Sequence, residues 1–140
     1  MSRFFSEKYA DLEPYTPGEQ PQDRAYIKLN TNESPFPPSV SVAAAVKEES
    51  ELLQLYCDPE CRELREEMSK VFGVNSKNIM MVNGSDEALN FAFMAFADQK
   101  CPLVFPDITY GFYPVFAQLN RIPYTEIPLN SDFSINPADY

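Results

Sequence analysis

The sequence has 140 residues, of which 44% are hydrophobic and 14% aromatic, and its formal net charge is -10. This length suits one domain, and the apolar content is sufficient for a hydrophobic core. The acidic balance argues against nucleic acid or an anionic membrane as a partner, because the chain has no cluster of Lys and Arg to neutralise phosphates.

The cysteine count and the absence of histidine limit the chemistry that the chain can perform. An odd number of cysteines (Cys57, Cys61 and Cys101) without a secretory signal favours reduced thiols in a cytoplasmic protein. A zinc site would need two further ligands of the right kind, and no Ser–His or Cys–His catalytic pair is possible. The N-terminus has no long apolar run, so we expect neither a signal peptide nor a membrane anchor.

The first half of the chain predicts an arm followed by a helical segment. Residues 1–39 are rich in proline, but the tyrosines spread through them indicate an ordered arm rather than disorder. Residues 40–73 predict one helix over 40–53, with Ser39 as its N-cap, and a second over 60–72 that ends at Gly73. Apolar residues recur at helical spacing on one face of the second helix: Cys61, Leu64, Met68, Val71 and Phe72.

The last part of the chain, residues 74–140, has the pattern of an α/β fold. Short apolar runs predict buried strands at residues 78–82, 103–105 and 122–127, with helices over 86–96 and 110–119 between them. Strand, helix, strand, helix, strand is typical of a mainly parallel sheet covered by helices. We therefore predict that a domain begins at residue 74.

The stretch NGSDEALNFAFMAF, residues 83–96, places a tight turn directly before an apolar helix. Gly84 permits the bend, and we expect the Ser85 hydroxyl to cap the helix. The free N–H groups of the first turn, together with the helix dipole, form an anion site beyond the end of a strand. The alternative is an ordinary core helix, in which Asp86 and Glu87 only balance the dipole. These residues alone favour the core helix over the anion site.

Three further segments contain candidate site residues. Tyr110, in PDITYGFY, follows a predicted strand, and its ring suits either a planar ligand or the core. Asn32 and Glu33, in LNTNESP, lie in a polar loop that is also consistent with a simple turn. Tyr56, between two predicted helices, is either a packing residue or a site residue.

Taken together, LNTNESPFPPS, LYCDPECRELREEM, NGSDEALNFAFMAF and PDITYGFYPVF resemble the N-terminal part of fold type I pyridoxal-phosphate aminotransferases, above all the histidinol-phosphate aminotransferases. The likeness runs from about Tyr15 onward. It implies an incomplete large domain of three α/β/α layers with a mainly parallel sheet, an N-terminal arm and helices of the small domain. One departure is Cys57, where members of the family usually have proline.

The resemblance also implies a role for each candidate residue. The N–H groups of Ser85 and Asp86 would hold the phosphate of pyridoxal 5′-phosphate, and Tyr110 would stack on its pyridine ring. Tyr56 would reach the cofactor phosphate of the neighbouring subunit in a homodimer. The residues of the arm that would approach the substrate are Tyr15, Asn32 and Glu33. The implied reaction is amino transfer between histidinol phosphate and 2-oxoglutarate in histidine biosynthesis.

The family's Schiff-base lysine has no counterpart here. None of the six lysines lies in a segment like the family's lysine motif, so the resemblance implies an N-terminal fragment that is inactive alone and leaves cofactor binding by the chain alone open. It also implies that the strand at 78–82 lies at the opposite edge of the sheet from the other two, so we expect the three strands not to form one continuous sheet in this chain. The alternatives are a fragment of a pyridoxal-phosphate decarboxylase acting on a phosphorylated amino acid, and a non-catalytic binding remnant.

Overall fold

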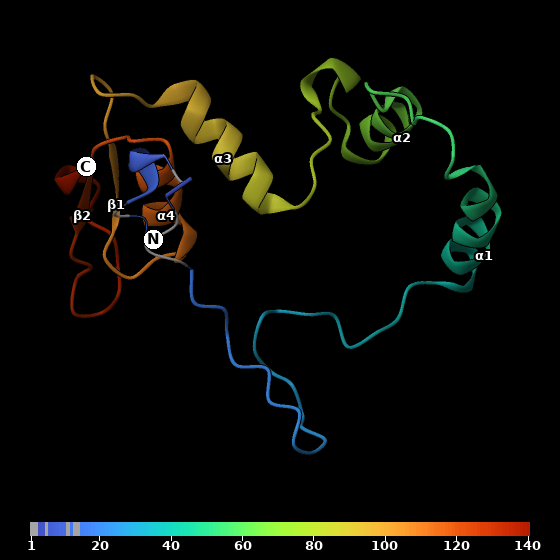
Figure 1. Cartoon of the computed structure of the whole chain (residues 1–140), viewed down its shortest axis with the longest axis horizontal. Helices are drawn as coiled ribbons and strands as arrows, with labels where there is room; N and C mark the ends of the chain where they lie inside the picture. The colour runs from blue at the N-terminus through green and yellow to red at the C-terminus, as the bar shows by residue number, and fades with distance from the viewer. Residues whose placement is uncertain (1–2, 5, 11, 13–14) are drawn as a thin grey trace. The chain divides into compact units, whose positions relative to one another are not determined.

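The computed structural model describes residues 3–4, 6–10, 12 and 15–140 (Figure 1). Contacts divide the chain into two compact units. Unit 1 comprises Met1–Thr16 with Val82–Tyr140, and unit 2 comprises Pro17–Met81. The domain boundaries expected from the sequence, after residues 39 and 73, stay a prediction. Within the described residues, no helix has both the length and the apolar character needed to cross a membrane.

The centre of unit 1 is a strand–helix–strand segment formed by β1 (Leu103–Pro106), α4 (Phe112–Leu119) and β2 (Tyr124–Ile127). The two strands pair in parallel (Figure 1), with Leu103 opposite Tyr124 and Pro106 opposite Ile127. The predicted strands and the helix between them are confirmed, although α4 begins at Phe112 rather than at Tyr110 and β2 begins at Tyr124. Two short 3-10 helices, η1 (Glu7–Tyr9) and η4 (Pro137–Asp139), belong to the same unit.

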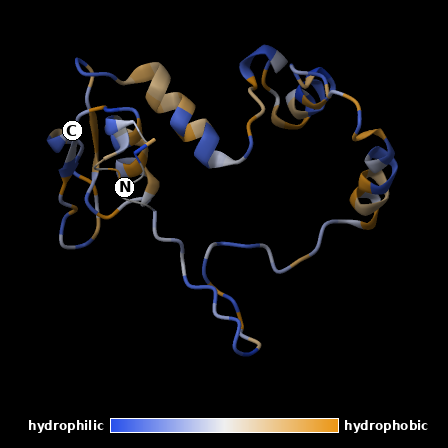
Figure 2. Cartoon of the chain, viewed as in Figure 1, coloured by the Kyte–Doolittle hydropathy of each residue, from blue (hydrophilic) through white to orange (hydrophobic). Residues whose placement is uncertain are grey.

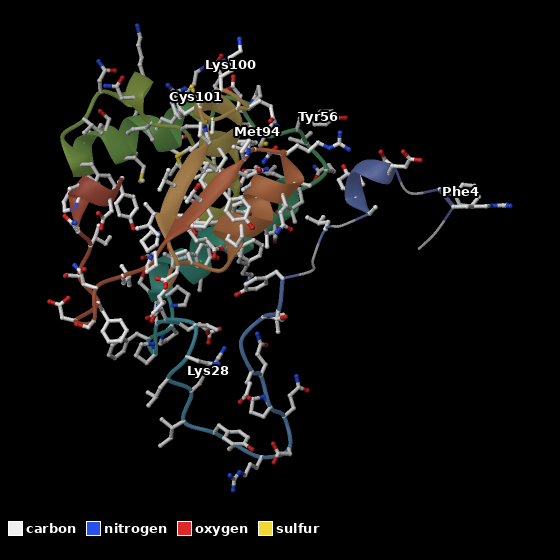
Figure 3. All side chains as sticks on the ribbon, turned by 90° about the vertical axis from the view of Figure 1, so that its left-hand side faces the viewer. Phe4, Lys28, Tyr56, Met94, Lys100 and Cys101 are labelled. Atoms are coloured by element: carbon white, nitrogen blue, oxygen red, sulfur yellow. The ribbon has the colours of Figure 1, made fainter. Side chains whose placement is uncertain are left out.

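The buried side chains of the described residues all belong to this segment: Phe105, Phe116, Ala117 and Ile122. Aromatic rings join it to α3 (Ser85–Phe96), since Phe93 meets Phe116 edge-on at 6.1 Å between ring centroids. Beyond its first turn, α3 is apolar except at Asn90 (Figure 2), yet none of its residues is buried, and Met94, labelled in Figure 3, is 60% exposed. The alternative interpretation of α3 as an ordinary core helix therefore does not agree with the structure, because α4 is its only substantial neighbour among the described elements.

The predicted strand at residues 78–82 is also wrong. Asn78 ends the 3-10 helix η3 (Ser76–Asn78), and residues 79–82 form no strand. The sheet of the described residues contains only β1 and β2, so this apolar run has no neighbour with which to pair its N–H and C=O groups. The expectation that it does not share one continuous sheet with the other two strands agrees with the structure.

Unit 2 contains α1 (Val40–Glu49), continued by the 3-10 helix η2 (Ser50–Leu52), and α2 (Arg62–Phe72). The predicted helix ends are confirmed at Ser39, whose hydroxyl accepts from the Val42 N–H, and at Gly73, which has φ 66°. Helix α2 begins at Arg62, two residues later than predicted, because an Asp58 carboxylate oxygen accepts from the Arg62 N–H at 2.9 Å. No residue of unit 2 is buried.

Candidate functional site

The turn before α3 has the backbone geometry that the sequence suggested, but a different cap. Gly84 is the N-cap, with φ 82° and ψ 170°, a conformation open essentially only to glycine. Ser85 is the first helical residue and its hydroxyl makes no capping bond, so the expected serine cap is wrong. A Cβ added at Gly84 would meet no atom within 4 Å, so the space above the turn is open.

Two backbone donors of this turn are free to bind a ligand. Among the described residues, no hydrogen bond from the N–H of Ser85 or of Asp86 is found. These two N–H groups lie at the positive end of the helix dipole, where an anion is stabilised. We refer to the N–H groups of Ser85 and Asp86, with the open turn at Gly84, as the anion seat.

Glu87 fixes the turn from the other side. Its carboxylate accepts a hydrogen bond from the Asn83 N–H at 2.6 Å, so the third helical residue reaches back to the chain that enters the helix. This is the arrangement of a capping box, displaced by one residue. It satisfies a donor outside the anion seat and leaves the two seat donors available.

Tyr110 lies beside the first turn of α3, in the loop that follows β1. Asp107 follows β1, and its N–H donates to the Ile127 carbonyl at 3.0 Å while its carboxylate accepts from the N–H of Ile108 and of Leu129. The chain then continues to Tyr110, whose hydroxyl donates to the Asp86 carboxylate at 2.7 Å. Two segments 24 residues apart are thereby joined at the first turn of α3.

The hydrogen bond to Asp86 raises the pKa of Tyr110 to about 12, and desolvation and the Asp86 charge act in the same direction. The cause is that the carboxylate stabilises the protonated phenol and repels the phenolate. The Asp86 carboxylate therefore favours the protonated form of Tyr110 and holds its hydroxyl in place.

Tyr15 lies against the same aromatic group. Its ring is 4.0 Å from the Phe112 ring, centroid to centroid, and Phe112 is 5.6 Å from Tyr110. Unit 1 therefore gathers four of the predicted site residues into one region: Ser85, Asp86, Tyr110 and Tyr15.

The other three predicted residues belong to unit 2, and their roles stay predictions. Glu33 accepts from the Lys28 ammonium at 2.6 Å, and this hydrogen bond and charge lower the pKa of Glu33. Lys28 is labelled in Figure 3. Asn32 has φ 52°, which places it in a left-handed turn. Tyr56, labelled in Figure 3, is fully exposed.

The anion seat fits the phosphate of pyridoxal 5′-phosphate. Backbone donors at a helix N-terminus suit a phosphate monoester, and an open glycine turn allows its oxygens to approach the backbone. Tyr110, held at the same turn, offers an aromatic face to a planar ring. For a metal, by contrast, the described residues contain no group of three or more Cys, Asp or Glu side chains close enough to bind one.

Comparison with known proteins identifies the family of the chain. Residues 24–140 match the family described as aminotransferase class I and II. The chain belongs to this family. A histidinol-phosphate aminotransferase from Marinomonas sp. is 52% identical over the whole chain, and one from Clostridium acetobutylicum is 47% identical over 97% of it. The chain spans 40% and 39% of the length of these two aminotransferases.

A solved aminotransferase structure shows the same fold. It comes from Erwinia carotovora atroseptica, its assignment as a histidinol-phosphate aminotransferase is provisional, and it superposes with a TM-score of 0.69 at 25% sequence identity. The match covers 76% of this chain and 31% of that one. The expected partial fold type I architecture and the likeness to histidinol-phosphate aminotransferases are confirmed.

The sequence did not predict the bond between Tyr110 and Asp86. Both residues were candidates, but for separate reasons: Tyr110 for its aromatic ring and Asp86 for its backbone N–H. The only signal available was that each follows a predicted strand, and the carboxyl ends of parallel strands meet at one edge of a sheet. Asp107, which joins the ends of β1 and β2, was likewise not singled out.

Proposed function

We propose that this chain supplies the cofactor-phosphate site and the ring-stacking tyrosine of a pyridoxal-phosphate-dependent histidinol-phosphate aminotransferase. The observation that carries the proposal is the anion seat, with its two free N–H groups, held beside Tyr110 by the hydrogen bond to Asp86. The names of the relatives support histidinol phosphate as one substrate of amino transfer, and we propose 2-oxoglutarate as the other.

Each residue of the seat has a distinct task. Bound pyridoxal 5′-phosphate supplies the carbonyl group and the electron-accepting ring that amino transfer needs. Ser85 and Asp86 donate their N–H groups to the phosphate, Gly84 allows the close approach, and Tyr110 covers one face of the ring. These contacts orient the cofactor but do not themselves move a proton.

The other predicted site residues would contact a second subunit or the substrate. Tyr56 is fully exposed, which suits contact with the cofactor phosphate of a second subunit in a cytoplasmic homodimer. Tyr15, Asn32 and Glu33 approach the substrate. The Schiff-base lysine comes from outside these 140 residues, so we expect no transaminase activity from the 140-residue chain alone.

A chimeric enzyme tests the proposal directly. The 140 residues replace the corresponding part of the Marinomonas aminotransferase, and the gene is introduced into a bacterial strain that lacks its own histidinol-phosphate aminotransferase. We expect growth without histidine, and amino transfer from histidinol phosphate to 2-oxoglutarate by the purified chimera. A folded chimera that binds the cofactor but does not act on histidinol phosphate would refute the proposed substrate.

Substitution at Gly84 serves as the matched test of the seat. Gly84→Val in the chimera places a branched side chain where the phosphate approaches the backbone, and we expect loss of cofactor affinity and activity. Ser85→Ala is the control, because it keeps the backbone N–H and removes a hydroxyl that makes no capping bond. Equal cofactor affinity in Gly84→Val and the unsubstituted chimera would show that the phosphate binds elsewhere.

A further inference from the structure

The two acidic side chains in the first turn of α3 point to different partners. Glu87 accepts from the Asn83 N–H at 2.6 Å, within its own turn. Asp86 accepts from the Tyr110 hydroxyl at 2.7 Å, across 24 residues of sequence. An aspartate in a first helical turn ordinarily interacts with the free N–H groups of that turn, because the dipole attracts its charge.

The alternative position of the Asp86 carboxylate would conflict with the anion seat. If the carboxylate turned back, it would bind the N–H groups that the proposed function assigns to a phosphate. Two anions cannot occupy the same donors. The Tyr110 hydroxyl, a donor that is protonated at physiological pH, offers the carboxylate a hydrogen bond elsewhere, at 2.7 Å.

We propose that Asp86 and Tyr110 are a positioning pair, in which Tyr110 holds the Asp86 carboxylate off the anion seat and Asp86 fixes the Tyr110 ring beside it. This inference rests on the proposed function for the identity of the ligand, a phosphate monoester attached to a planar ring. Tyr110 thus acts through its hydroxyl as well as through its ring, and Asp86 acts through its side chain as well as through its backbone.

The surroundings of the pair are aromatic. The Tyr113 ring meets Tyr110 edge-on at 6.0 Å, and Phe112 lies between Tyr110 and Tyr15. Both neighbouring tyrosines act in the same direction as Asp86 on the Tyr110 hydroxyl. Tyr113 is the matched control, because among the described residues its hydroxyl makes no hydrogen bond.

The first test follows the Tyr110 hydroxyl and needs no ligand. The 140-residue chain is labelled with ¹³C at the tyrosine ring carbon that bears the hydroxyl, the Tyr110 signal is assigned with Tyr110→Phe, and its pH titration is followed by NMR. We expect Asp86→Asn to lower the midpoint toward the ordinary value of about 10. Glu87→Gln, which changes the other acid of the same turn, is expected to leave it unchanged. An unchanged midpoint in Asp86→Asn would overturn the pair.

The second test follows the anion seat with inorganic phosphate, using the amide signals of Ser85 and Asp86. We expect Tyr110→Phe to weaken phosphate binding about fivefold, the factor that a competing capping bond of about 1 kcal/mol corresponds to. Tyr113→Phe is expected to have no effect. The double variant Asp86→Ala with Tyr110→Phe is expected to recover the affinity, because the side-chain acceptor that competes for the N–H groups has been removed.

The outcomes separate the two claims. No recovery in the double variant would show that Tyr110→Phe acts by general disruption, and would overturn the proposal that Tyr110 keeps the seat open. If the unsubstituted chain shows no phosphate binding at all, the proposed function of the anion seat is refuted. The proposal that Tyr110 holds the Asp86 carboxylate off the anion seat is then refuted as well. The titration of Tyr110 would still confirm or overturn the bond that positions its ring.

Discussion

The two units of the chain contain similar numbers of residues but differ in the contacts that stabilise them. Unit 1 contains every buried side chain of the described residues, gathered where β1, α4 and the start of β2 meet. Unit 2 contains none, and its helices are defined instead by polar contacts at their ends, from Ser39, Asp58 and Gly73. This difference shows that capping residues can determine where a helix begins and ends, whereas the burial of a side chain requires a neighbouring helix or strand.

The same contrast explains where the candidate site is formed. Tyr110 and Asp86 meet because β1 and the contact between α3 and α4 fix both segments. In unit 2, α1 and α2 have 10 and 11 residues, lengths at which an isolated helix is marginal in water. Large apolar side chains there stay exposed, such as Val71 at 75% and Leu53 at 81%.

The largest expected difference between the units comes from removing one aromatic ring in each. Phe116→Ala in unit 1 removes a side chain that is 7% exposed and stacks on Phe112, so we expect a loss of about 3–5 kcal/mol in the free energy of unfolding. Phe72→Ala in unit 2, 64% exposed, is expected to stay within about 0.5 kcal/mol. Denaturant titration measures both, and equal losses would break the comparison.

The second comparison uses the two glycines with positive φ, one in each unit. Gly84 has φ 82° and ψ 170°, whereas Gly73 has φ 66° and ψ 26°, the left-handed helical region. We expect Gly84→Ala to cost more, near the upper end of about 1–3 kcal/mol, than Gly73→Ala, at about 1 kcal/mol. An added Cβ meets nothing at either position, so the difference reports backbone strain alone. Denaturant titration of both variants would contradict this reasoning if Gly73→Ala proved the costlier.

The third prediction concerns Asp107, which joins the ends of β1 and β2. Asp107→Ala removes the acceptor of the Leu129 N–H, and we expect a local loss of about 1 kcal/mol, seen as faster hydrogen exchange at that amide. Asp107→Asn keeps an acceptor oxygen at the same position and serves as the control. Unchanged exchange at Leu129 in the alanine variant would show that this contact does not hold the strand ends together.

The smallest effect is the response of α2 to acid. The hydrogen bonds from the Arg62 and Glu60 N–H groups lower the pKa of Asp58 below its ordinary value of 3.8. A lowered pKa means that the cap stabilises α2 above that value and is lost as the pH falls through the lower folded pKa. We expect the protection factors of the amides at the start of α2, which correct for the intrinsic pH dependence of exchange, to fall below about pH 4, and Asp58→Asn to abolish this fall. Protection factors that do not change with pH in the unsubstituted chain would contradict it.

Local signals in the sequence predicted the local features well. Ser39 and Gly73 act at the helix ends where they stand, and the apolar runs around Leu103 and Tyr124 form the two paired strands. The failures concern features that depend on distant residues. Among the described residues, the run at 78–82 has strand-like composition but no strand paired with it, and α3 has core-like composition but α4 as its only substantial neighbour.

The candidate site shows the same limit. The glycine turn and the aromatic residue could each be predicted, because the turn geometry and the position after a strand are local properties. The hydrogen bond between Asp86 and Tyr110 could not be predicted, since nothing in the sequence of either segment indicates that the other is its partner. Ser85 was expected to cap α3, but Gly84 is the N-cap and Glu87 reaches back to the Asn83 N–H instead.

The central claim is that unit 1 presents an anion seat with Tyr110 fixed beside it. The most direct test is titration of the ¹⁵N-labelled 140-residue chain with pyridoxamine 5′-phosphate, which has the ring and the phosphate but no aldehyde to react with lysines. We predict saturable amide shifts concentrated at Ser85, Asp86 and Tyr110, and their loss in Gly84→Val. Shifts of equal size in that variant, or no saturable shift at these three residues, would contradict the account.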